Sequence, residues 1–171
     1  MSGNDAHGAF ERECLTLREV RTKYSAGPTT GIFTDGSSIP NPGPGGWGFV
    51  HVIEGEIVAE RHGHHPDTTN NRMELTALIE AYKHLPVDAV VTMHSDSNLC
   101  VQTVNQWAAS WERQWWKRKT GPIANLELVK ELYHEHKRHP KVKLIWVKAH
   151  NGWLWNEYAD ALSTAWMRGS L

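Results

Sequence analysis

Carboxylate side chains occur in this sequence at positions where they could meet in the folded chain. Asp35 and Asp96 each follow a strongly apolar segment that predicts a buried strand. If these two strands are parallel neighbours, both carboxylates emerge at one edge of the sheet, where open α/β sheets place their sites. Glu74 and Asp160 lie in segments with helical hydrophobic spacing, and they could complete the group.

Several carboxylates that converge on one point repel one another unless a divalent cation lies between them. Ligation by oxygen alone favours a hard ion, so Mg²⁺ or Mn²⁺ is expected rather than Zn²⁺. Two such ions about 3.5–4 Å apart can activate water and stabilise the leaving oxygen in phosphodiester cleavage. Taken alone, each aspartate also fits the more common role of a helix cap or turn residue.

The elements that would position these residues follow from the apolar patterns. Strands are predicted at residues 31–35, 47–53, 56–60, 89–95 and 143–147. Helices are predicted at about residues 69–85, 97–110, 124–138 and 157–166. Glu54-Gly55 predicts a hairpin turn between the second and third strands. This order indicates a mixed α/β domain over residues 29–171, preceded at residues 1–28 by a tail that is either a short helix or disordered.

Composition indicates an ordinary globular chain. It has 171 residues, of which 40% are apolar and 22% charged. There is no apolar run long enough for a membrane span, and no signal peptide is evident. Cys14 and Cys100 do not suggest a disulfide framework, so a cytoplasmic location and a monomer with a self-sufficient core are expected. The net charge of −1 predicts no general affinity for nucleic acid, although residues 115–119 form a basic, aromatic segment.

Six short motifs occur in a characteristic order: Thr34-Asp35-Gly36-Ser37, Asn41-Pro42-Gly43-Pro44-Gly45-Gly46, Thr69-Asn70-Asn71-Arg72-Met73-Glu74-Leu75, Ser95-Asp96-Ser97, Val147-Lys148-Ala149-His150 and Asn156-Glu157-Tyr158-Ala159-Asp160. Their order and spacing resemble ribonuclease H type 1 over about residues 30–168. The resemblance implies the ribonuclease H-like fold, a five-stranded mixed sheet flanked by helices. It also implies an endonuclease that cleaves the RNA strand of an RNA–DNA hybrid and leaves 5′-phosphate and 3′-hydroxyl ends.

The resemblance further implies a catalytic quartet of carboxylates, Asp35, Glu74, Asp96 and Asp160, that holds two Mg²⁺ ions, with Mn²⁺ as a possible substitute. Asp35 would bridge both ions, Glu74 and Asp96 would complete one site, and Asp160 would serve the other. His150 matches a histidine on a mobile loop that assists proton transfer or product release. A solvated loop histidine without a catalytic role is the structural alternative.

Recognition of the RNA strand would involve Asn41, Asn70 and Asn71, which match positions facing the minor groove of the hybrid. Amide side chains both donate to and accept from hydroxyl groups. Asn41 could equally form a turn and Asn70 begin a helix, and both roles can coexist. Thr69 and Asn125 match a pocket that holds a phosphate of the DNA strand.

The DNA strand would also meet a basic protrusion, which the segment from Trp107 to Lys119 resembles. Trp107 would lie against a deoxyribose, while Lys117, Arg118 and Lys119 would meet phosphates. The helical spacing of the tryptophans favours a packing role for Trp111.

Two features depart from the expected pattern or suggest another site. Asp67 occupies a position where an arginine is common and would repel a phosphate, although Arg61, His64 or His65 could compensate. The cluster at residues 62–65 contains three histidines, but a solvated turn is expected there rather than a metal site.

Three other functions are compatible with parts of this pattern. The domain also occurs as the nuclease segment of reverse transcriptases, although the Met1 start favours a free enzyme. A non-catalytic module that binds hybrids is a second possibility, since fold alone does not imply activity. The presence of the whole carboxylate quartet counts against it. A nuclease or integrase acting on DNA is the third, and the asparagines and the basic segment disfavour it.

Overall fold

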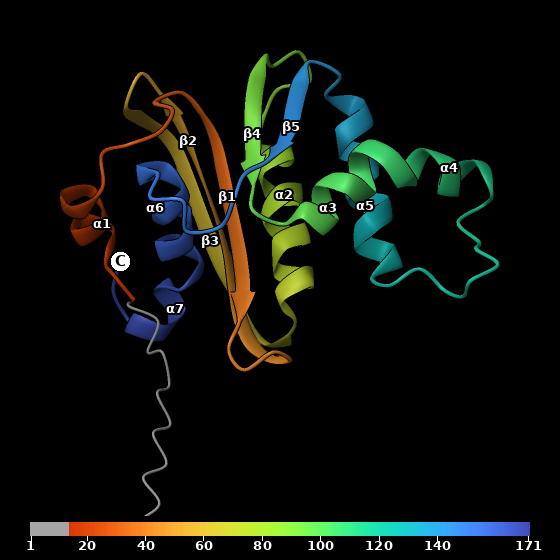
Figure 1. The fold of residues 1–171 in the computed structure, drawn as a ribbon, viewed down its shortest axis with the longest axis horizontal. Helices are drawn as coiled ribbons and strands as arrows, with labels where there is room; N and C mark the ends of the chain where they lie inside the picture. Colours follow the sequence, from red (N-terminus) through yellow and green to blue (C-terminus); the bar gives the residue numbers. More distant parts are fainter. Residues whose placement is uncertain (1–13) are drawn as a thin grey trace, which may run out of the picture.

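The computed structural model describes residues 14–171, and the chain forms a five-stranded mixed sheet in the order β3-β2-β1-β4-β5 (Figure 1). The strands are β1 (Gly31–Ser38), β2 (Gly43–Ile53), β3 (Glu56–Thr68), β4 (Val91–Ser95) and β5 (Val142–Trp146). β1, β2 and β3 pair antiparallel, whereas β1, β4 and β5 are parallel neighbours. The predicted mixed sheet is thereby confirmed, as is the hairpin at Glu54-Gly55.

Helices cover both faces of the sheet (Figure 1). On one face lie α2 (Asn70–His84), α3 (Asn98–Gln102) and α5 (Leu126–Arg138), and on the other lie α1 (Leu17–Lys23) and α6 (Leu154–Ser163), which is followed by α7 (Ala165–Arg168). Each face has its own apolar core, with Leu78 and Met93 at the centre of the first and Phe33 and Trp155 in the second. Within residues 14–171, no helix has the length and apolar character needed to cross a bilayer.

Helix α2 begins where the sequence predicts. Thr69 is its N-cap, and the Thr69 hydroxyl accepts a hydrogen bond from the backbone N–H of Arg72 at 3.2 Å. The helix ends before Pro86, which cannot continue it. Glu74 is the fifth helical residue, so it lies in the second turn of α2 and faces the sheet.

The glycines of β1 and β2 allow helices to approach the sheet on both faces. A Cβ atom on Gly36 would stand 2.3 Å from the backbone carbon of Met73 in α2. On the opposite face, a Cβ atom on Gly48 would stand 2.5 Å from the Cβ atom of Leu162 in α6. Only glycine permits such close packing of a helix against a strand. The two helices that carry Glu74 and Asp160 are therefore held tightly against the middle of the sheet.

Strand β1 extends beyond Asp35, where the sequence pattern predicts its end. The strand pairs with β2 as far as Ser38, because the glycines of β2 continue the antiparallel ladder. Its parallel pairing with β4 ends at Thr34, opposite Ser95. Asp35 therefore lies where β1 and β4 separate, and Asp96 directly follows the last paired residue of β4.

The histidines at residues 62–65 lie in β3, so the prediction of a turn there is wrong. β3 runs to Thr68 as an edge strand, and His62 and His64 pair with Gly48 and Gly46 of β2. The side chains of His62, His64 and His65 are exposed. A polar strand with exposed side chains lacks the apolar alternation by which strands are recognised.

Two further segments are longer or better ordered than their patterns indicate. The helix predicted at residues 97–110 continues to Arg113 through α3, a π-helical segment at Thr103–Trp107, and α4 (Ala108–Arg113). Within the N-terminal segment, α1 has a capping box formed by Thr16 and Glu19, and Val20 packs into the core beneath α6. The rest of the predicted tail, residues 1–13, lies outside the described residues.

Candidate active site

Four carboxylates converge at the point where β1 and β4 separate. Ligand oxygens of Asp35, Glu74 and Asp96 lie within 4.8 Å of one another, and the charge of Asp160 also acts on Asp35. They come from different elements: Asp35 from β1, Glu74 from α2, Asp96 from the end of β4, and Asp160 from α6. The structure thus brings together the whole quartet that the sequence predicts. Asp35 and Glu74 are buried, at 6% and 8% exposure.

The carboxylates destabilise one another in the absence of a counter-ion. Burial raises the pKa of Asp35 well above its ordinary value, and the charges of Asp96 and Asp160 raise it further. The pKa of Glu74 is likewise raised well above its ordinary value by burial and then by Asp35 and Asp96. Among the described residues, the charges that act most strongly on Asp35 and Glu74 are those of the neighbouring carboxylates.

Two buried oxygens of the group are left without a hydrogen-bond partner among the described residues, Oε2 of Glu74 and Oδ1 of Asp96. Buried polar atoms are normally satisfied, so such atoms mark the position of a missing ligand. Ligand oxygens of Asp35, Glu74 and Asp96 lie within 4.8 Å of one another. This all-oxygen donor set fits a hard divalent cation such as Mg²⁺ or Mn²⁺.

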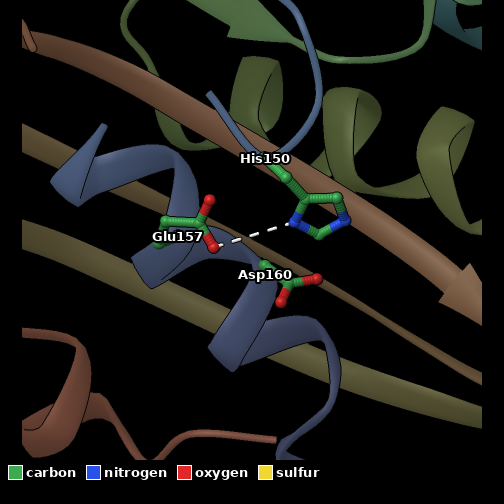
Figure 2. A group of neighbouring side chains, drawn as sticks. All are labelled: His150, Glu157 and Asp160. Carbon is green, nitrogen blue, oxygen red and sulfur yellow. Dashed lines mark ion pairs between the residues drawn. The ribbon is translucent and has the colours of Figure 1, made fainter. Parts of the chain in front are cut away.

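A second group of potential ligands surrounds Asp160. The side chains of His150 and Glu157 point toward each other above Asp160, and the three ligand atoms lie within 4.8 Å (Figure 2). His150 stands on the exposed loop before α6, with Nδ1 3.8 Å from Oε2 of Glu157. Sequence reasoning missed Glu157 as a functional candidate. Its position three residues before Asp160 could have indicated it, because residues i and i+3 share one helix face.

The asparagines predicted to face the hybrid also fasten the edge of the site. Oδ1 of Asn70 accepts the backbone N–H of Ser38 at 2.7 Å, and Oδ1 of Asn41 accepts that of Asn70 at 3.1 Å. These bonds tie the end of β1 and its following loop to the start of α2. Asn70 and Asn71 line the same open cleft as Asp35 and Glu74. The structural roles foreseen for Asn41 and Asn70 are therefore present.

Thr69 and Asn125 are linked through Arg72, a residue that sequence reasoning did not single out. Nη1 of Arg72 donates to Oδ1 of Asn125 at 3.1 Å and forms an ion pair with Glu127 at 2.6 Å. The backbone N–H of Arg72 donates to the Thr69 hydroxyl. Arg72 belongs to the same motif as Glu74, and its positive charge is the feature that could have indicated a role in phosphate binding.

The basic segment lies beside two neighbouring tryptophan rings that are tilted against each other. Trp107 and Trp111 lie with ring centroids 6.0 Å apart and line a cavity of about 420 Å³ together with Asn71. Arg118 donates to the backbone oxygens of Gly121 and Pro122, at 3.2 and 2.6 Å, and its guanidinium lies 5.4 Å from the Trp111 ring centroid. Arg118 therefore fastens its own loop. Trp115, at 85%, and the three basic residues Lys117, Arg118 and Lys119 are exposed.

A mixed sheet with two carboxylates at its parallel strands and two more on the helices packed against it, beside a cleft lined by amides, is the arrangement of a nuclease of the ribonuclease H fold. Comparison with known proteins agrees. The sequence model of the RNase H family matches residues 28–168. The ribonuclease H of Gluconobacter oxydans is 42% identical over 138 residues, covering 80% of this chain and 91% of that protein. Ribonuclease HI of Campylobacter jejuni is 44% identical over 77% of this chain and 86% of its own.

Solved structures give the same result. LC9-RNase H1, described as a type 1 RNase H with the type 2 active-site motif, is 32% identical with a TM-score of 0.70, covering 86% of this chain and 76% of that one. LC11-RNase H1, solved in complex with an RNA/DNA hybrid, is 28% identical with a TM-score of 0.59, covering 78% and 92%. The chain belongs to the ribonuclease H family, and it is an endonucleolytic hydrolase. The predicted resemblance to type 1 enzymes is confirmed.

Proposed function

We propose that this enzyme hydrolyses the RNA strand of RNA–DNA hybrids with two divalent cations and leaves 5′-phosphate and 3′-hydroxyl ends. The observation that carries the proposal is the convergence of four carboxylates with two buried oxygens left unpaired. Bound Mg²⁺, or Mn²⁺ in its place, would activate the attacking water and stabilise the departing oxygen. The family's defining substrate and the hybrid bound to LC11-RNase H1 support the choice of substrate.

The arrangement of the carboxylates supports two cation sites that share Asp35. Asp35 groups with Glu74 and Asp96, with ligand oxygens within 4.8 Å, and the charge of Asp160 also acts on it. Glu74 and Asp96 would hold one ion with Asp35, and Asp160 would hold the second. His150, which lines the same cleft as Asp35, would transfer a proton or assist release of the product.

Selectivity for RNA would depend on the asparagines beside the carboxylates. Asn70 and Asn71 line the catalytic cleft, and Asn41 is held against Asn70 by a hydrogen bond. Their amides are suited to 2′-hydroxyl groups across the minor groove of an A-like duplex. A DNA strand lacks these hydroxyls, so the strand lying over the carboxylates would be RNA.

The DNA strand would be held by two neighbouring surfaces. Thr69 and Asn125 would bind one of its phosphates. Arg72, whose guanidinium contacts Asn125 and pairs with Glu127, would supply the positive charge that Asp67 does not. Trp107 would pack against a deoxyribose, while the basic residues Lys117, Arg118 and Lys119 would offset the charge of the following phosphates. In this role Arg118 acts chiefly by shaping the loop that presents both lysines.

An end-labelled RNA–DNA hybrid tests the proposed function. The purified protein is incubated with the hybrid, with and without Mg²⁺, beside double-stranded RNA, single-stranded RNA and double-stranded DNA. Magnesium-dependent cutting of the RNA strand of the hybrid alone is expected. A folded protein that binds the hybrid but cuts nothing in Mg²⁺ or Mn²⁺ would instead be a binding module. Cutting of double-stranded DNA would favour the DNA nuclease.

We also propose that the enzyme acts as a monomer in a reducing compartment, the cytoplasm. Cys14 and Cys100 are both free, which supports a reducing environment. The two apolar cores on either side of the sheet are enclosed by this chain's own helices, which supports a monomer. Light scattering after gel filtration should give the mass of one chain, about 19.4 kDa, and a doubled mass would contradict this.

A further inference from the structure

The loop that carries His150 is tied to the first turn of α6. Oδ1 of Asn151 accepts the backbone N–H of Trp153 at 3.0 Å and the side-chain amide of Asn156 at 3.2 Å. These bonds fix the end of the loop but do not contact the imidazole. The side chain that faces the imidazole is Glu157, the next residue of the same helix (Figure 2).

Glu157 has the contacts of a group that holds another in place. Its carboxylate faces Nδ1 of His150 across 3.8 Å, and the backbone of Gly152 also acts on it electrostatically. Its side chain is only 11% exposed, whereas that of His150 is 59% exposed. The less exposed carboxylate of Glu157 should therefore restrict the imidazole of His150 more than the imidazole restricts the carboxylate. The separation exceeds a hydrogen bond, and contacts of this kind commonly tighten once substrate is bound.

We propose that Glu157 is the positioning residue for His150, accepting its Nδ1–H and so presenting the unprotonated Nε2 to the carboxylate cleft. In neutral imidazole one nitrogen donates and the other accepts, and the partner of one nitrogen decides the role of the other. With Nδ1–H directed at Glu157, Nε2 is the atom free to take a proton. His150 lines the cleft that contains Asp35 and Glu74, which places that atom beside the reaction. The consequence for catalysis rests on the proposed function, but the orientation of the ring does not.

The orientation is tested without substrate or metal by nitrogen NMR of the imidazole side chains. Spectra are recorded at about pH 8.5, where a free imidazole is neutral. The His150 signal is identified as the one missing from His150→Ala. The wild type should show the tautomer protonated at Nδ1. Glu157→Ala should shift the population toward the Nε2 form, and Glu157→Gln, whose amide oxygen is a weaker acceptor, should shift it less. Glu56→Gln, a change at an exposed glutamate of β3, should leave it unchanged.

The consequence is tested by single and double variants in the hybrid-cleavage assay. Glu157→Gln should lower kcat by about tenfold with KM unchanged, which is less than the 10²–10⁴-fold that a positioned acid or base supplies. In the His150→Ala background the same change should have no further effect, because Glu157 acts through His150. Glu157→Gln keeps the size of the side chain, so this test does not depend on the fold tolerating alanine.

Two results would overturn the assignment. An unchanged His150 tautomer in Glu157→Ala would show that the carboxylate does not orient the ring. Independent, additive losses of kcat in the double variant would show that Glu157 acts by another route, and a parallel loss of Mg²⁺ affinity would make it a cation ligand with Asp160. If neither the wild type nor any variant cuts the hybrid, the proposed function fails. The NMR measurement of the tautomer still tests the orientation of the ring in that case.

Discussion

Gly36 of β1 lies so close to α2 that a Cβ atom on it would stand 2.5 Å from the backbone nitrogen of Glu74. Asp35 precedes Gly36, and its Oδ1 accepts the Gly36 N–H at 2.8 Å. The Gly36 residue therefore orients the carboxylate of Asp35 and leaves room for α2, the helix that carries Glu74. The Asp-Gly pair in the first motif thus has a packing role as well as a chemical one.

Replacing Gly36 by alanine should push α2 away from β1. The inserted methyl group meets backbone atoms of Met73 and Glu74, which cannot rotate out of its way. Overpacking of this kind costs about 1–3 kcal/mol. Urea unfolding of Gly36→Ala should therefore show a lower midpoint, and cleavage should fall by more than the unfolded fraction explains. A variant with unchanged stability would mean that α2 is not held at this distance.

Replacing Asp35 by asparagine should stabilise the metal-free protein. A raised folded pKa means that a carboxyl group contributes stability below its unfolded pKa, near 3.9, and loses it as the pH rises through the folded value. Asp35→Asn removes this loss, so its stability advantage should grow with pH. At neutral pH a gain of about 1 kcal/mol corresponds to a Tm higher by about 2–4 °C.

Added Mg²⁺ should reverse that difference. A ligand that binds only the folded state raises Tm, so the wild type should gain and Asp35→Asn should gain much less. Asp88→Asn, which alters an exposed carboxylate between α2 and β4, is the control and should behave as the wild type. If neither Mg²⁺ nor Mn²⁺ changes the Tm of the wild type, that result would argue against a cation site among the carboxylates.

Acid should weaken the fold through a pair of histidines outside the active site. Nδ1 of His51 lies 3.1 Å from Nε2 of His84, and burial lowers the pKa of both side chains. The unfolded chain then binds protons more readily, so stability is retained above about pH 6.5 and falls as the pH drops below it. His84→Gln should lose less stability than the wild type between about pH 7.5 and 5.5.

The control for this pair is His62→Gln, a change at an exposed histidine of β3. It should show the full acid sensitivity of the wild type in urea unfolding at both pH values. If His84→Gln loses as much stability as the wild type between these pH values, the acid-sensitive groups lie elsewhere in the protein.

Two exposed lysines should account for part of the salt dependence of hybrid binding. A protein that neutralises phosphates releases counter-ions, and each lost contact flattens the plot of log affinity against log salt by about 0.9 or less. Lys117→Ala/Lys119→Ala should therefore flatten the slope, measured by fluorescence anisotropy with catalytically inactive protein. Lys141→Ala/Lys143→Ala removes the same charge at the opposite ends of the parallel strands and should not. Equal slopes in both variants would contradict the proposed path of the DNA strand.

Features that depend on short stretches of sequence were predicted correctly. Apolar runs predicted the central strands, and Thr69 and Pro86 predicted the limits of α2. The aspartates after two such strands predicted the site, because parallel pairing alone brings their ends together. Features that depend on long-range contacts were missed. The edge strand with His62 and His64 is defined by its pairing with β2, and Arg72 meets Asn125 only in the folded chain.

The role of Arg118 shows the same limit in the site itself. A run of three basic residues predicts three phosphate contacts, and two of the three guanidinium nitrogens of Arg118 already donate to carbonyl groups of its own loop. Nothing in the sequence distinguishes it from its neighbours, since the distinction arises from the loop's turn back toward Trp111. Charge patterns indicate where a polyanion can bind, and the fold decides which side chains remain available.

The most direct test of the carboxylate site is single-turnover cleavage of an RNA–DNA hybrid by Asp35→Asn at saturating protein in Mg²⁺. Asp35 is the carboxylate that both proposed cation sites share, so the variant should bind the hybrid with the affinity of the wild type or better and cut it at no measurable rate. Cutting at a rate comparable with that of the wild type would contradict the two-cation account and would require a different catalytic group.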